Sequence, residues 1–265
     1  MRPGKKLLVL FLLALPLAAE TYPRVNTGLV ELEWESAGWR VVSVHSLGTA
    51  HLTLLPGDVL QRLNGVEAAR IAPFQLKELV LSANDHRLNV ALERGGRKEE
   101  LVLGPLRPGK DDTPIAAHAD DAAAWLAPDF TLTDEAGRSH SLRDAAGRYV
   151  LLSFFASWCG PCQQEAGSLD DLARRHPDRL LLLGIDTDDS ADKLRLFRAK
   201  YPIDFPVVEG QTFQSGMAKS YHVDGLPELV LMGPDGRILY VDVAGFLQPP
   251  PAVVAARALL ENPRQ

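Results

Sequence analysis

The chemistry available to this chain of 265 residues centres on its two cysteines, Cys159 and Cys162, which lie in the run Trp158-Cys159-Gly160-Pro161-Cys162. A disulfide between cysteines so close in sequence closes a tiny loop, and such a loop removes little entropy from the unfolded chain. Two thiols are also too few for a structural zinc site, which needs four ligands. We therefore expect redox chemistry from the pair itself, with no metal and no other cofactor.

The elements around the pair are expected to activate the first cysteine. The continuous apolar run 149–155 predicts a strand that is covered on both faces, and a helix is expected over 159–176. Cys159 would then face the unpaired N–H groups and the positive dipole at the helix start, which favour a thiolate. Pro161 fits the first helical turn because it has no N–H to leave unsatisfied. Cys159 is therefore predicted to attack a partner's disulfide, and Cys162, within one turn, to resolve the mixed disulfide.

The rest of the C-terminal region alternates strand and helix patterns. A strand–helix–strand unit is followed by a hairpin and a last helix, which predicts an α/β fold whose mixed sheet has helices on both faces. The strands are expected at 149–155, 180–185, 229–232 and 238–243, and the helices at 159–176, 191–200 and 251–260.

The run 155–162 resembles the active site of thioredoxin. Together with 127–132 upstream and Glu165 downstream, it resembles the exported TlpA/ResA-like branch of thiol–disulfide oxidoreductases, over about 125–260. The resemblance implies a thioredoxin-like fold for 123–265, and protein disulfides as substrates. It also implies a set of further site residues: Trp158, Gly160 and Pro161 beside the cysteines, Pro227 as a cis-proline facing the disulfide, and Leu226 as the residue whose backbone pairs with a substrate strand.

The ionisation of the two thiols is expected to depend on three further positions of the redox region. Ser153 stands where thioredoxins have a buried aspartate, so another group must assist Cys162. Glu165 is the candidate, one helical turn beyond Cys162, although a glutamate in the first turns of a helix also simply complements its dipole. Glu228 follows Pro227, and a carboxylate near the thiolate would oppose its ionisation and could select basic partners.

The direction of electron flow is predicted from the residues between the cysteines. Gly160 and Pro161 resemble thioredoxin, a strong reductant at about −270 mV, rather than the oxidant DsbA at about −120 mV. A reductant of exported thiols is therefore expected, with a DsbD-like membrane protein as its electron donor. Oxidant or isomerase action on the same residues remains open. Cytochrome c maturation, copper-site assembly and oxidative repair are all compatible with the family resemblance. A peroxiredoxin, which shares the 127–132 opening, is disfavoured because its cysteine lies in a different motif.

Residues 20–104 predict a small β-rich region with one helix over 72–82. The runs 54–60 and 63–66 resemble bacterial PDZ domains, which bind a C-terminal peptide by adding it as a strand. The resemblance implies peptide-binding residues in a carboxylate loop and a groove helix: Ala37, Gly38, Trp39, Leu76 and Val80. The alternatives are a spacer that packs on the redox domain, or a binding adaptor in which redox activity is secondary.

The remaining segments concern organisation and location. Prolines and aspartates without an apolar period predict a linker over 105–122. Basic residues, a short apolar run and small residues predict a secretory signal over 1–19, with an uncleaved anchor as the alternative. A periplasmic or otherwise extracytoplasmic protein is therefore expected. The formal net charge of −6 argues against nucleic acid as a partner.

Overall fold

The computed structural model describes residues 23–27, 30–44, 54–83, 85–104, 117, 120, 125–145, 147–187, 190–211, 216–243 and 249–261. The expected signal over 1–19 and nearly all of the expected linker over 105–122 lie outside these ranges. Among the described residues, no helix has the length and apolar content needed to cross a membrane.

The C-terminal region is built on five strands in the order β12 (Val207–Gln211), β11 (Leu180–Thr187), β10 (Tyr149–Phe155), β13 (Glu228–Met232) and β14 (Ile238–Val243). The first three run parallel, whereas β13 is antiparallel to both β10 and β14. The predicted mixed sheet is therefore confirmed. β12 was missed, because its five residues include Glu209 and Gly210 and carry no clear apolar period.

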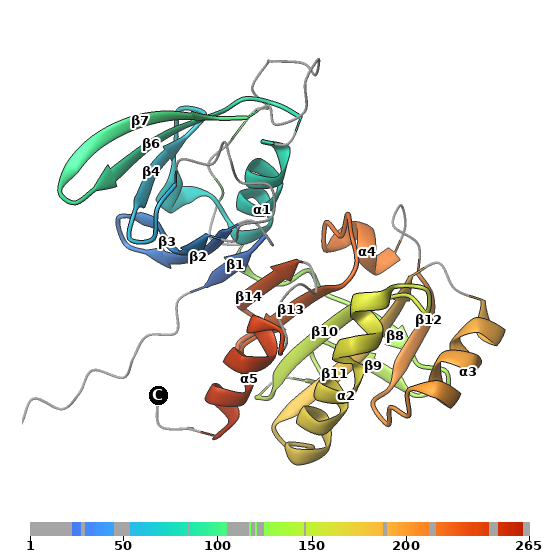
Figure 1. Cartoon of the computed structure of the whole chain (residues 1–265). Coiled ribbons are helices and arrows are strands. Elements are labelled where there is room, and N and C mark those ends of the chain that lie inside the picture. Colours follow the sequence, from blue (N-terminus) through green and yellow to red (C-terminus); the bar gives the residue numbers. More distant parts are fainter. Residues whose placement is uncertain are drawn as a thin grey trace, which may run out of the picture.

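Helices cover both faces of this sheet, as Figure 1 shows. One apolar cluster joins the sheet to α2 (Gly160–Arg175), α3 (Ala191–Lys200) and α5 (Pro251–Glu261), and it includes both cysteines. The other face packs against α4 (Gly216–Ser220) and, from the N-terminal region, α1 (Pro73–Ser82). β10 contributes side chains to both clusters. Leu151 and Phe155 belong to the cluster that contains the cysteines, and Leu152 and Phe154 belong to the cluster on the other face.

The N-terminal region is β-rich, as predicted. Its strands are ordered β2 (Val30–Glu35), β3 (Gly38–Val44), β4 (Val59–Leu63), β6 (Leu88–Arg94) and β7 (Arg97–Leu103), with the short β5 (Val66–Glu67) beside β4 and a 3-10 turn at Ala68–Arg70. Asn64 and Gly65 have positive φ angles of 45° and 87° and connect β4 to β5. This is the hairpin turn expected from an Asn-Gly pair.

A short strand joins the two regions into one sheet. β1 (Arg24–Asn26) pairs in parallel with β14 and antiparallel with β2, so twelve strands share one hydrogen-bonded network. In Figure 1, β1 lies where the two halves of the molecule meet. Trp125 adds an apolar contact, stacked on Trp39 at 5.8 Å and edge-on to Trp34 at 5.5 Å between ring centroids. The N-terminal region is therefore packed against the redox region. The sequence did not predict that the two regions would share one sheet.

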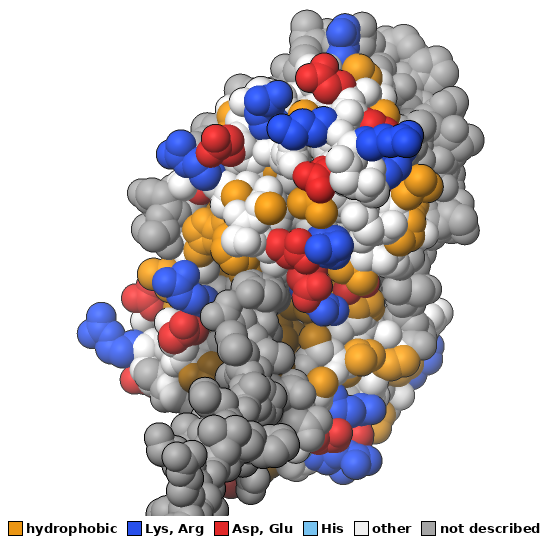
Figure 2. Space-filling model, turned by 90° about the vertical axis from the view of Figure 1, so that its left-hand side faces the viewer, with side chains coloured by type: hydrophobic (Ala, Val, Ile, Leu, Met, Phe, Trp, Pro, Cys, Tyr) orange, Lys and Arg blue, Asp and Glu red, His pale blue; other side chains and the backbone are white. Residues whose placement is uncertain are grey.

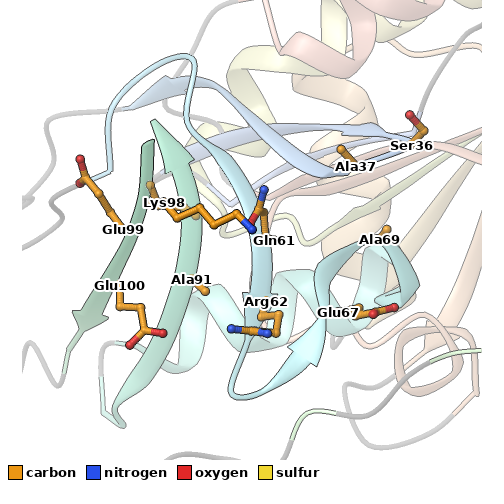
Figure 3. A pocket seen from close by; sticks show the side chains of 11 residues that line it. Ser36, Ala37, Gln61, Arg62, Glu67, Ala69, Ala91, Lys98, Glu99 and Glu100 are labelled. Atoms are coloured by element: carbon orange, nitrogen blue, oxygen red, sulfur yellow. The ribbon is translucent and has the colours of Figure 1, made fainter. Parts of the chain in front are cut away.

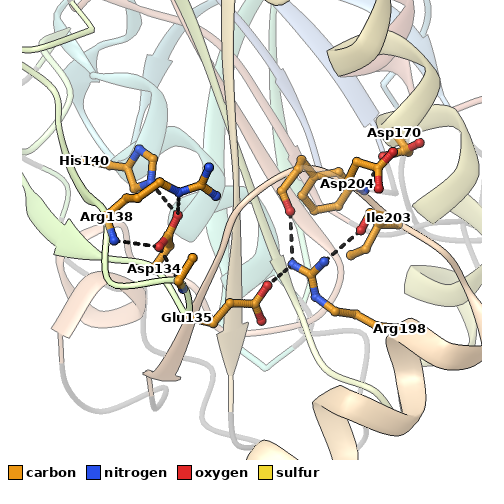
Figure 4. Close-up of polar contacts among 10 residues, drawn as sticks. Asp134, Glu135, Arg138, His140, Asp170, Arg198, Ile203 and Asp204 are labelled. Atoms are coloured by element: carbon orange, nitrogen blue, oxygen red, sulfur yellow. Dashed lines mark hydrogen bonds and ion pairs between the residues drawn. The ribbon is translucent and has the colours of Figure 1, made fainter.

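A two-stranded hairpin, β8 (Thr131–Thr133) and β9 (Ser139–Ser141), is fastened by its own polar groups. The buried Asp134 carboxylate accepts hydrogen bonds from Arg138 Nε at 2.8 Å and pairs with His140 Nε2 at 2.9 Å. Glu135, in the turn, forms an ion pair with Arg198 of α3 (Figure 4). These contacts tie the start of the redox region to a helix on the cysteine side of the sheet.

Candidate active site

The two cysteines form a disulfide at the start of α2, with an S–S distance of 2.03 Å. Cys159 is the N-cap of this helix, one residue earlier than the helix proper, and its Sγ accepts a hydrogen bond from the Cys162 backbone N–H at 3.2 Å. The sulfur thus faces the helix start, where N–H groups favour a thiolate. Both cysteines are nearly buried, while Trp158 beside them is 59% exposed. Gly160 and Pro161 form the first turn between the two sulfurs.

The cis-proline segment is brought to the cysteines by strand pairing. The Leu226–Pro227 peptide bond is cis, as the thioredoxin resemblance implies. Pro227 leads directly into β13, whose first residue pairs with Phe154 of β10, and β10 leads to the cysteines. Leu226 is partly buried and packs against the apolar cluster that contains Cys159 and Cys162.

Glu165 lies on the buried face of α2, one turn beyond Cys162. Its side chain is 1% exposed, and neither carboxylate oxygen has a hydrogen-bond partner among the residues described. Burial raises the pKa of Glu165 to about 8, with a further contribution from the Asp242 carboxylate. Complementing the helix dipole does not require such burial. Its burial therefore distinguishes Glu165 from an exposed glutamate that only complements the helix dipole.

Asp242 is a buried acid that sequence reasoning missed. It accepts hydrogen bonds from Asn26 Nδ2 of β1 at 2.8 Å and from the Ala252 N–H at the start of α5 at 2.9 Å. Burial raises its pKa to about 7, although both hydrogen bonds act in the opposite direction. The available signal was one aspartate within the otherwise apolar strand pattern 238–243.

The expected role of Glu228 is corrected by the structure. Its side chain is fully buried and forms an ion pair with Lys77 of α1, with Nζ at 2.9 and 3.1 Å from the two carboxylate oxygens. Burial raises the pKa of Glu228 to about 7, against the opposing effect of Lys77. Because its carboxylate is paired inside the protein, Glu228 does not face solvent where it could select basic partners.

Among the described residues, most of those expected to bind a C-terminal peptide are buried and do not surround an open groove. Trp39 is buried and donates its indole N–H to the Ile71 carbonyl at 3.1 Å, and Leu76 and Val80 lie in the core. At Trp39, β3 is paired on one edge with β2 and on the other with β4, so strand addition there would require one of them to move. Gly38 has φ +143°, with the Leu60 carbonyl oxygen against it.

Of these residues, Ala37 in the turn between β2 and β3 is exposed, and it lines a depression of about 520 Å³ on the face of β4, β6 and β7 (Figure 3). Its other polar lining includes Arg62, Lys98 and Glu100. On the molecular face in Figure 2, acidic and basic side chains are intermingled. The residues that line this pocket are far from the cysteines in sequence. Ala37 is the one lining residue that also belongs to the groove implied by the PDZ resemblance.

Comparison with known proteins places the redox region in a family. The model of the AhpC/TSA family matches residues 125–241. The chain is 32% identical over 120 residues to thioredoxin-like protein YneN of Bacillus subtilis, covering 44% of this chain and 69% of that protein. It is 29% identical over 114 residues to thiol-disulfide oxidoreductase ResA of Bacillus cereus, covering 43% of this chain and 65% of ResA, slightly less than two thirds of its length.

Among solved structures, the thioredoxin domain of a thiol-disulfide oxidoreductase from Bacteroides vulgatus is 27% identical, with a TM-score of 0.40, over 44% of this chain and 86% of that one. The family match falls on the strands and helices that carry the disulfide, the cis-proline and Glu165. This chain therefore belongs to the AhpC/TSA family of thioredoxin-like proteins and is a thioredoxin-like thiol–disulfide oxidoreductase.

Proposed function

We propose that the protein is exported and reduces disulfides of particular extracytoplasmic proteins through Cys159 and Cys162. The observation that carries the proposal is the position of Cys159, capping α2 with the Cys162 N–H on its sulfur. Glu165 is buried on the same helix, and the cis Leu226–Pro227 bond immediately precedes β13. Export rests on the signal-like residues 1–19.

The reaction is a pair of thiol–disulfide exchanges. The Cys159 thiolate attacks one sulfur of the substrate disulfide, which breaks and releases one substrate thiolate. Cys162 then loses its proton and attacks the Cys159 sulfur, which releases the second substrate thiolate and leaves the Cys159–Cys162 disulfide. With a pKa of about 8, Glu165 is suited to accept the Cys162 proton and to return it in the reverse direction.

Each turnover transfers two electrons to the substrate, so the disulfide must be reduced again. A membrane protein of the DsbD type would supply these electrons outside the cytoplasm. The exposed Trp158 and the backbone of Leu226 form the side from which an extended substrate, or this donor, would approach. Capture of a partner by the N-terminal region remains a second, separate proposal, for which the buried Leu76 and Val80 offer no open groove.

The test is to trap the mixed disulfide. Cys162→Ser keeps the attacking thiol but cannot resolve the intermediate, so it should accumulate a covalent complex with a peptide disulfide, detected by non-reducing electrophoresis and mass spectrometry. Cys159→Ser is the matched control and should trap nothing. Trapping through Cys162 instead would reverse the assigned roles, and no trapping by either variant would refute the proposal.

A further inference from the structure

Helix α1 of the N-terminal region contacts the segment that ends at the cis-proline. The Phe74 ring stacks on His222 with centroids 5.7 Å apart, and Glu78 Oε1 lies 2.5 Å from His222 Nδ1. Between them on the helix, Lys77 donates to the His222 backbone carbonyl. His222 has a positive φ of 53°, and the segment continues from it to Pro227.

Lys77 is also bonded to the other end of the same segment. Its Nζ donates to both carboxylate oxygens of Glu228, and both side chains are fully buried. With the His222 carbonyl, the three hydrogen atoms of the ammonium group are all engaged. One side chain thus bridges His222 and Glu228, the residues that flank the cis-proline segment.

The ion pair lies behind the cis-proline, on the face of the sheet opposite the cysteines, because Phe154 and α1 belong to one apolar cluster and both cysteines to the other. Glu228 follows Pro227 directly and pairs with Phe154, five residues before Cys159 in the chain. As a pair, Lys77 and Glu228 contribute no net charge. An unpaired charge of either sign in a buried position would act over a longer range, because the interior screens it weakly.

We propose that Lys77 is a positioning residue of the redox site, which fixes the segment 222–228 and cancels the charge of Glu228 in the buried layer behind the cis-proline. This inference rests on the proposed redox function of the same site. It makes the N-terminal region a structural part of that site, because α1 supplies a group that the redox region lacks on its own.

The experiment measures the equilibrium constant for reduction of the Cys159–Cys162 disulfide by glutathione in the full-length wild-type protein and in variants. The pH is set one unit above the pKa of Glu228, which is about 7. Glu228→Gln leaves the Lys77 charge uncompensated, which stabilises the Cys159 thiolate, so the constant should rise about threefold to tenfold. Lys77→Met removes the positive charge and the group that holds down the pKa of Glu228, so the buried carboxyl group takes up a proton and the constant should stay within about twofold of the wild-type value. The double variant Lys77→Met/Glu228→Gln should return to within about twofold of the wild-type value.

The control is Lys98→Met, which removes an exposed lysine from the same region and should leave the constant unchanged. If Lys77 and Glu228 had a purely structural role, their substitution would destabilise the oxidised and reduced forms alike. The equilibrium constant for reduction would then be unchanged. A wild-type value for Glu228→Gln, or an equal rise in the variant that also lacks Lys77, would overturn the inference. If Lys77→Met fails to fold, Glu228→Gln alone decides, since glutamine still accepts a hydrogen bond from Lys77. A wild-type protein without reversible redox activity would instead refute the proposed function.

Discussion

At the scale of single residues, Glu165 has the most direct chemical consequence. Because burial raises its pKa to about 8, the rate of disulfide exchange should show a group that titrates near that pH. Glu165→Gln should remove this inflection and slow resolution of the mixed disulfide about 10- to 100-fold. The measurement is the pH profile of the second-order rate with a peptide disulfide. Glu100→Gln, on exposed β7, is the control, and an unchanged profile for Glu165→Gln would exclude the proton-transfer role.

The same carboxyl group should also make stability depend on pH. The folded protein keeps the Glu165 proton up to a pKa of about 8, whereas the unfolded chain loses it near 4.5. Between these values the native state binds more protons, so the free energy of unfolding should fall as pH rises, by at most about 1.4 kcal/mol per unit for this group. Urea denaturation across this range should give a shallower slope for Glu165→Gln. Equal slopes would mean that the carboxyl group is not buried as described.

Local motifs predicted some residues of the site and not others. Cys159, Cys162 and Pro227 were named from short runs of sequence, and the structure places all three at adjoining elements. Lys77 and Asn26 were not named, because their partners lie far along the chain, at Glu228 and Asp242. Each lies among other polar residues, Lys77 next to Glu78 and Asn26 next to Thr27, so neither stood out in the sequence. Only the assembled fold shows which charge or hydrogen bond it meets.

At the scale of elements, periodicity predicted the long strands and helices well. β10, β11, α3 and α5 appear within about two residues of their expected bounds. β1 was not predicted, because three residues carry no period. Its place is decided by the free edges of β14 and β2 rather than by its own sequence. This short strand is the element that converts two expected modules into one sheet.

The turn from β2 to β3 provides a stability prediction. Gly38 has φ +143°, and a Cβ there would lie 2.0 Å from the Leu60 carbonyl oxygen. Gly38→Ala should therefore lower the free energy of unfolding by about 2 kcal/mol or more. Gly167→Ala, on the exposed side of α2 with open space around it, should instead raise it by about 0.5–1 kcal/mol. Denaturant unfolding measures both, and a neutral Gly38→Ala would contradict the packing of this turn.

At the scale of the whole molecule, the expected arrangement was a capture module on a linker. That arrangement predicts that removing the N-terminal region lowers activity only on a natural partner. The shared sheet predicts a different result, since a chain starting at residue 125 loses β1, the Lys77 partner of Glu228 and the Asn26 partner of Asp242. It also exposes the edge of β14, which favours aggregation.

We therefore expect the truncated chain to lose activity on a small disulfide and on a folded protein substrate alike, by about tenfold or more. Rates with both substrates, measured beside the full-length chain and with thermal unfolding, provide the test. A truncated chain that keeps full activity on the small disulfide would support the tethered arrangement instead.

The most direct test of the redox function is the reduction potential of the Cys159–Cys162 pair, measured by equilibration of the full-length protein with glutathione or dithiothreitol buffers. A reductant should give a value near that of thioredoxin, about −270 mV. A value near that of DsbA, about −120 mV, would contradict the proposed direction and make the protein an oxidant or isomerase. A pair that never forms a disulfide in solution would contradict the redox function itself.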